Sequence, residues 1–108
     1  MAQDPVLTLD RKLRRLAAER SRLADENARC DAMGGNPGEL DAAFVAHSEK
    51  WHPAMRALAD TPAATMDGVL AKLRVLAGSM VAGRETVYDE DILLLAIADL
   101  ERLSRRDN

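Results

Sequence analysis

The stretch that decides the fold is Pro5-Val-Leu-Thr-Leu-Asp-Arg-Lys-Leu-Arg-Arg-Leu-Ala-Ala-Glu-Arg-Ser-Arg-Leu-Ala-Asp-Glu-Asn27. Its apolar positions recur every three or four residues, which is the heptad spacing of a helix that packs along a seam. Asp4 and Pro5 supply an N-cap and a first-turn proline, so a helix of about 38 Å is expected up to Cys30. The seam positions are Val6, Leu9, Leu13, Leu16, Arg20, Leu23, Asn27 and Cys30.

The composition of the 108-residue chain favours an all-α protein. Apolar residues make up 47% of the sequence but aromatic residues only 3%, and leucine, alanine, arginine and glutamate are strong helix formers. A chain of this length is enough for one domain. Its single cysteine cannot form an intramolecular disulfide, which favours a reducing compartment.

Turn signals divide the chain into four expected helices. Glycine and proline between Gly34 and Gly38 end the first helix. Thr65 is the expected N-cap of the third helix, and Thr86 with Asp89 resembles a capping box at the start of the fourth. The sequence therefore predicts one all-α domain: a long coiled-coil-like helix over residues 1–30, a hinge over 31–38 and a compact three-helix block over 39–108. This arrangement is bundle-like, and a second subunit could complete it.

Each later helix has an expected apolar face. The fourth helix is apolar over more than half of its circumference, which is typical of a helix held between others or shared with a second subunit. The second helix presents Leu40, Phe44, His47, Trp51, Met55 and Leu58; the third presents Met66, Val69, Leu70, Leu73, Leu76, Ala77 and Met80; the fourth presents Ile92, Leu94, Leu95, Ala98, Leu100 and Leu103.

The stretch His47-Ser-Glu-Lys-Trp-His-Pro-Ala-Met55 holds both histidines and the only tryptophan. Glu49 and His52 have the spacing of a di-iron half-motif, but the chain has no second half-motif, so no metal site is expected. His47 is interpreted as a partly buried histidine that a neighbouring group satisfies. Pro53 lacks an amide hydrogen and is expected to kink or interrupt the helix, with His52 displaced from helical geometry.

Nothing in the sequence indicates an enzyme. Cys30 falls near the C-terminal end of the first helix, where the helix dipole disfavours a thiolate. The glycines from Gly34 to Gly38 lack the lysine and preceding strand of a phosphate-binding loop. No catalytic residue, cofactor or metal is therefore expected.

A cluster of basic residues lies on the first helix. Arg11, Lys12, Arg14, Arg15 and Arg22 could lie against the phosphates of a nucleic acid. The alternative is a solvated face beside the seam, where long arginine stems cover apolar edges. The net charge of −3 argues mildly against nucleic acid as the main partner.

Three segments, Gly38–Phe44, Thr61–Arg74 and Ile92–Leu103, carry a resemblance. They are similar to a group of small uncharacterised helical proteins of alphaproteobacteria and their prophages, whose central phrase is close to Pro-Ala-Thr-Thr-Leu-x-Gly-x-x-Ala-Lys-x-Arg. The resemblance covers residues 38–104 approximately and implies a short helical module without a known activity. Gly68 matches the glycine of the phrase, and a residue without a side chain in the first helical turn lets a neighbouring helix approach closely.

Two functions follow from these patterns. The favoured one is an interaction or structural module that forms a homodimer, or docks another helical protein, through Leu9, Leu13, Leu16, Arg20, Leu23 and Asn27. The same leucines could instead fold back onto the chain's own helices. The alternative function is a small nucleic-acid-binding regulator that uses the basic cluster. The longest apolar run, Ile92–Ala98, is far shorter than a membrane span, so a cytoplasmic protein without a membrane partner is expected.

Overall fold

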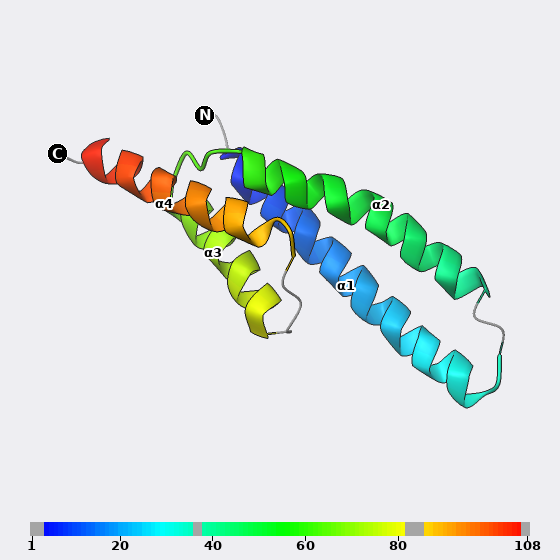
Figure 1. Cartoon of the computed structure of the whole chain (residues 1–108). Helices are drawn as coiled ribbons and strands as arrows, with labels where there is room; N and C mark the ends of the chain where they lie inside the picture. Colours follow the sequence, from blue (N-terminus) through cyan, green and yellow to red (C-terminus); the bar gives the residue numbers. More distant parts are fainter. Residues whose placement is uncertain (1–3, 36–37, 82–85, 107–108) are drawn as a thin grey trace.

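The computed structural model describes residues 4–35, 38–81 and 86–106, the side chains of residues 80 and 81 excepted. The described chain is all-α, as predicted, with four helices that pack in pairs (Figure 1). They are α1 (Pro5–Ala32), α2 (Gly38–Asp60), α3 (Met66–Val81) and α4 (Asp89–Arg106). None of these helices is long and apolar enough to cross a membrane.

Local signals at its two ends fix the length of α1. The carboxylate of Asp4 accepts a hydrogen bond from the backbone amide of Val6 at 3.0 Å, which confirms the expected N-cap. At the other end Gly34 has a φ of 69°, and the amide of Gly35 donates to the carbonyl of Cys30 at 2.9 Å. This left-handed glycine turn satisfies the last carbonyls of the helix. Asn36 and Pro37, which complete the predicted hinge, lie outside the described residues.

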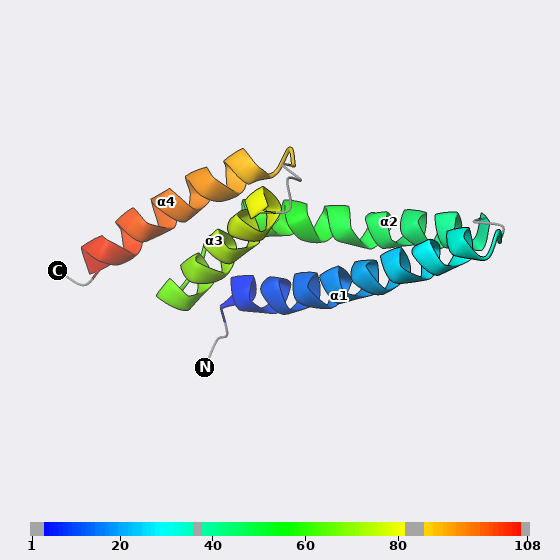
Figure 2. The same ribbon diagram turned by 90° about the horizontal axis from the view of Figure 1, so that it is seen from below.

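Helices α1 and α2 form a long antiparallel hairpin, and α3 and α4 form a shorter one beside its open end (Figures 1 and 2). Helix α1 contacts α2 and α3, whereas α4 contacts α3 and α2. The closed end of the long hairpin extends beyond the shorter one, so the molecule measures 62 × 30 × 17 Å. The far half of α1 therefore packs along α2 of its own chain.

The core lies where the two hairpins meet. It consists mainly of leucine, valine, isoleucine and alanine, as the low aromatic content requires. Its buried residues are Val6, Leu13, Leu16, Ala54, Met55, Leu58, Ala59, Ala63, Val69, Ala71, Leu76, Tyr88, Ile92, Ala96 and Leu103.

The buried face of α3 differs from the predicted one. Val69 and Leu76 are buried as expected, but Lys72 between them is buried as well. The face is therefore rotated toward Lys72, because this lysine has a buried acidic partner on α4. The predicted members Met66, Leu70 and Ala77 are exposed, and the side chain of Met80 lies outside the described part.

The buried face of α4 is narrower than predicted. Ile92 and Leu103 are buried, and Ala96 and Asp99 complete the face between them. Leu94 is 57% exposed, so it does not belong to the core. Ala98 is also exposed, and Leu95 and Leu100 are half-buried.

Helix α2 continues through Pro53, so the predicted interruption of the helix at this residue is wrong. His52 likewise keeps helical geometry. Pro53 lies on the exposed face of α2. There the carbonyl of Glu49, which has lost its amide donor, can turn toward water, and the packing of the flanking turns maintains the helix.

The expected caps of the last two helices are present. The hydroxyl of Thr65 accepts a hydrogen bond from the amide of Gly68 at 3.1 Å. The hydroxyl of Thr86 donates to one carboxylate oxygen of Asp89 at 2.6 Å, and its amide donates to the other at 3.2 Å. Both caps form from residues close in sequence, which is why composition and spacing were sufficient to predict them.

Candidate binding site between the first three helices

The predicted seam of α1 is turned toward the chain's own helices. Leu13, Leu16 and Leu23 are no more than 6% exposed, and Leu9 is half-buried against the core. Of the two polar seam residues, Asn27 is half-buried and Arg20 is exposed. The leucines therefore fold back within the chain, which is the alternative that the sequence left open.

His47 of α2 forms a hydrogen bond with the backbone of α1 in the middle of this seam. Its Nε2 lies 2.7 Å from the backbone carbonyl of Leu16, and the side chain is almost fully buried. A carbonyl oxygen can only accept, so the ring nitrogen carries the proton and donates. This contact confirms that a neighbouring group satisfies His47, and the side chain is buried more fully than the partly buried histidine that the sequence predicted.

A groove of about 610 Å³ lies where α1, α2 and α3 meet. Its floor is apolar and takes one or more side chains from each helix: Leu13 from α1, Trp51 and Met55 from α2, and Val75 from α3. The sequence predicted Leu13, Trp51 and Met55 as apolar face positions, but not that they would line one common groove. That arrangement depends on how three helices distant in sequence cross.

Arginines stand along the rim of the groove. Arg14 and Arg20 come from α1, and Arg74 comes from α3. Arg14 forms an ion pair within α1: its Nε lies 3.1 Å from a carboxylate oxygen of Asp10, which also lines the groove. Within the described ranges, neither Arg20 nor Arg74 has an ion-pair partner. The lining therefore carries two uncompensated positive charges.

The predicted basic cluster remains on the surface of α1. Arg11, Lys12, Arg14, Arg15 and Arg22 are all exposed. Arg11, Arg15 and Arg22 recur at helical spacing on the side of α1 opposite the seam, whereas Lys12 and Arg14 lie on its flanks. The structure thus brings three of the five residues onto one solvent-facing stripe.

Within the residues that the structure describes, no element covers the outer face of α4. This outer face consists of Leu93, Leu94 and Ile97, which are 45%, 57% and 45% exposed. On the adjacent α3, Met66 and Leu70 are 51% and 45% exposed. Large apolar side chains exposed together along one helix, as on α4, are typical of sites that contact another molecule.

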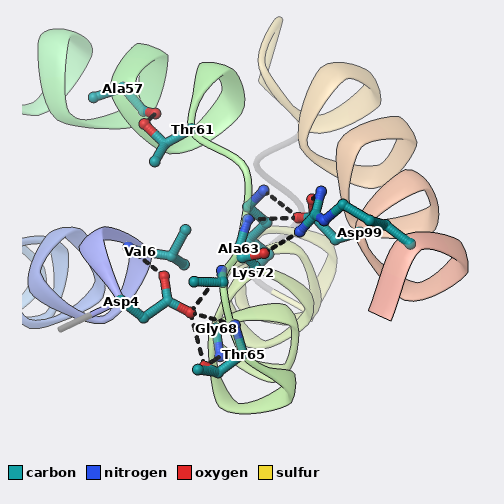
Figure 3. A network of polar contacts seen from close by, with 11 residues as sticks. Asp4, Val6, Ala57, Thr61, Ala63, Thr65, Gly68, Lys72 and Asp99 are labelled. Atoms are coloured by element: carbon teal, nitrogen blue, oxygen red, sulfur yellow. Dashed lines mark hydrogen bonds and ion pairs between the residues drawn. The ribbon is translucent and has the colours of Figure 1, made fainter. Parts of the chain in front are cut away.

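The carboxylate of Asp4 joins the start of α1 to the start of α3 (Figure 3). Besides capping α1, it accepts hydrogen bonds from the amides of Ala64 and Thr65 at 3.0 and 2.9 Å, and from the Thr65 hydroxyl at 2.7 Å. Burial by itself raises the pKa of Asp4, but the hydrogen bonds from Thr65, Val6 and Ala64 outweigh it and lower the pKa below the ordinary value.

A second carboxylate, that of Asp99, organises the other side of α3 (Figure 3). Its Oδ2 lies 2.7 Å from the Nζ of Lys72 and accepts the amide of Ala63 at 3.0 Å. Its Oδ1 accepts from Arg102 at 3.0 Å, and Arg102 also donates to the carbonyl of Ala63. The sequence analysis missed this cluster, although Lys72 falls at helical spacing between Val69 and Leu76 and could have been recognised as a buried-face position.

The described residues do not form a metal site. They contain no cluster of three or more histidine, cysteine, aspartate or glutamate side chains placed to share an ion. Nδ1 of His52 is instead 3.0 Å from the hydroxyl of Tyr88, and Trp51 packs edge-on against both rings. Tyr88 thereby links the end of the α3–α4 connection to α2.

Comparison with known proteins gives no relative from which a function could be carried over. No protein-family model, no curated protein sequence and no solved structure matches the chain. The resemblance to small helical proteins of alphaproteobacteria and their prophages therefore stays a prediction.

Proposed function

We propose that the protein is a homodimeric helical interaction module whose subunits pair through the outer face of α4. The observation that carries this proposal is the exposure of Leu93, Leu94 and Ile97 on one helix. The heptad spacing of α1 favours its seam as the interface, but the leucines of that seam are buried within the chain. We therefore propose the outer face of α4, rather than the seam of α1, as the dimer interface.

The charges of α4 favour a second copy as the occupant of this face. Its first turn contains Asp89, Glu90 and Asp91, and its last turn contains Arg105 and Arg106. If two copies of α4 pack antiparallel about a twofold axis, the acidic end of each faces the basic end of the other. A closed symmetric dimer of this kind makes the same contact twice.

The shape of the chain also favours association. The radius of gyration is 16.7 Å, whereas a compact domain of this length has about 13 Å. An elongated arrangement only 17 Å thick leaves helices covered on one side only. A partner on the α3–α4 hairpin would cover apolar surface that the chain itself leaves open.

Sedimentation equilibrium tests the proposal with Ile97→Asp and a matched control, Val45→Asp. Ile97 and Val45 are both exposed apolar residues on helices, 45% and 59% respectively, but only Ile97 belongs to the outer face. The wild type and Val45→Asp should sediment as dimers and Ile97→Asp as a monomer. A monomeric wild type at about 100 µM, well above the Kd of about 1 µM or lower expected for a specific dimer, would refute self-association.

A nucleic-acid-binding regulator is the second candidate, and the exposed stripe of Arg11, Arg15 and Arg22 favours it. Contacts with phosphates release counterions, so binding should fall steeply with salt concentration. A gel-shift titration of duplex DNA and RNA at low and physiological salt tests this candidate. The double variant Arg15→Ala with Arg22→Ala should bind more weakly with a smaller salt slope, and the absence of any shift at low salt would remove the candidate.

A further inference from the structure

We infer that the groove between α1, α2 and α3 is a binding site for an amphiphilic anion, a small molecule in which an apolar chain or ring carries one carboxylate, sulfonate or phosphate group. This site lies on different helix faces from the proposed dimer contact and does not depend on it. Three properties of the groove support the assignment: its apolar floor, the missing side chain at Gly78 and the charge of its rim.

The floor of the groove has the size and chemistry of a small-molecule site. Its volume of about 610 Å³ falls within the range of roughly 300–1,000 Å³ that is typical for such ligands. Leu13, Met55 and Val75 supply aliphatic surface, and Trp51 adds an aromatic wall that is only partly buried. An apolar chain or ring placed here would remove this surface from water.

Gly78 lines the groove, and a glycine at this position has a cost to the stability of α3. A glycine in the interior of a helix is less favourable than alanine by about 0.5–1 kcal/mol. Apart from its chain neighbours and the backbone of α3, no atom of the described residues lies within 4 Å of the position that a Cβ of Gly78 would occupy, so packing against them does not require a glycine. Gly78 lines the groove, so the absence of a side chain there leaves space for a ligand.

The rim selects for negative charge. Asp10 is the one carboxylate of the lining residues, and its ion pair with Arg14 balances it. Arg20 and Arg74 reach the groove from α1 and α3 without an ion-pair partner in the described part of the chain. Two guanidinium groups that line one groove can each donate paired hydrogen bonds to a carboxylate or phosphate.

Trp51 is the only tryptophan of the chain and reports directly on the groove. The probe is 11-bromoundecanoate below its critical micelle concentration, because a bromine atom near the indole quenches its fluorescence. We expect saturable quenching, and binding at least about tenfold weaker for the uncharged 11-bromoundecan-1-ol, which cannot form charge-assisted hydrogen bonds.

Variants then test the apolar floor and the charged rim of the groove separately. Gly78→Leu should fill the groove and abolish saturable quenching, and it should fold because leucine is a better helix former than glycine. Arg20→Gln with Arg74→Gln should weaken binding of the carboxylate about tenfold or more while leaving the alcohol unchanged. Arg22→Gln, on the opposite face of α1, is the matched control and should bind as the wild type does.

Three results would overturn the inference: quenching that does not saturate, equal affinity for the carboxylate and the alcohol, or unchanged binding by both the glycine and the double arginine variants. A saturable response of Trp51 to a synthetic acidic amphipathic helix, together with none to the bromoacid, would also overturn it and assign the groove to a protein partner. The monomeric Ile97→Asp variant should bind the bromoacid as tightly as the wild type does. The groove and the dimer are therefore tested independently.

Discussion

The Nζ of Lys72 lies 2.7 Å from the Oδ2 of Asp99, and neither side chain is exposed to solvent. This ion pair joins α3 to α4 inside the core. A buried pair is tolerated only when each charge is compensated and its remaining hydrogen-bonding capacity is used. Asp99 meets this condition through Ala63 and Arg102 in addition to Lys72. Lys72 has Asp99 as its counter-ion.

Asp99 has partners besides Lys72, whereas Lys72 has only Asp99 as its counter-ion in the described part of the chain. Substitutions of the two residues should therefore lower the free energy of unfolding by different amounts. Asp99→Asn should lower the free energy of unfolding by about 3–5 kcal/mol, because it leaves the ammonium of Lys72 buried without a counter-ion. Lys72→Met should cost less, about 1–3 kcal/mol, because Asp99 keeps Ala63 and Arg102. The double variant should lose less than the sum of the two. Urea unfolding followed by circular dichroism measures all three, and strict additivity would contradict the coupling.

The two glycines of α3 predict opposite effects for one substitution. A Cβ on Gly68 would overlap the carboxylate of Asp4 and press on the methyl group of Ala63 at 3.1 Å. Gly68→Ala should therefore destabilise the protein by about 1–3 kcal/mol. Gly78→Ala meets no neighbouring atom and should stabilise it by about 0.5–1 kcal/mol. The same urea experiment compares them, and a gain in stability for Gly68→Ala would show that the close approach is absent.

Asp4 predicts a loss of stability in acid. Its hydrogen bonds lower its pKa in the folded chain, so the stabilisation is complete above the unfolded pKa of about 3.9 and is lost as the pH falls through the folded pKa. The difference in unfolding free energy between the wild type and Asp4→Asn should be constant above about pH 5 and shrink below about pH 4. Asp25→Asn, at an exposed position of α1, controls for removal of a carboxylate. A difference that is constant down to pH 2 would contradict the assignment.

The elements that the sequence predicted correctly depend on local chemistry. Asp4 with Pro5, the glycine turn after α1, Thr65, and Thr86 with Asp89 act within a few residues of themselves. Their effect can be recognised without knowing what packs against the helix. Pro53 shows the limit of such rules, because its exposed position and the packing of the flanking turns allow α2 to continue.

The features that the sequence missed depend on contacts between distant helices. The helical spacing of Lys72 between Val69 and Leu76 is a local signal of burial, but its partner Asp99 follows 27 residues later, so no local pattern identifies the pair. The same holds for the groove: Arg20 is a predicted seam residue, and it lines one groove with Arg74 only because α1 and α3 pack together. The crossing of helices, rather than the pattern of any one helix, creates the candidate site.

The structure gives a physical role to part of the phrase that carried the sequence resemblance. Thr65 caps α3 and donates to Asp4, Gly68 makes room for that carboxylate, and Lys72 pairs with Asp99. Ala64 and Met66, the two positions where the chain departs from the phrase, are both exposed. In this chain these residues dock the start of α3 onto α1 and α4.

The central claim, a dimer formed by antiparallel packing of α4, is tested most directly by exchanging charges between its ends. In that dimer Glu90 of each copy faces Arg105 of the other. Sedimentation equilibrium should give the wild type twice the chain mass of 11.8 kDa. Glu90→Arg and Arg105→Glu should each weaken the dimer by about tenfold, through lost pairs and new repulsion, and the double variant should recover wild-type affinity. A wild type that sediments at 11.8 kDa, or a double variant no tighter than either single one, would contradict the claim.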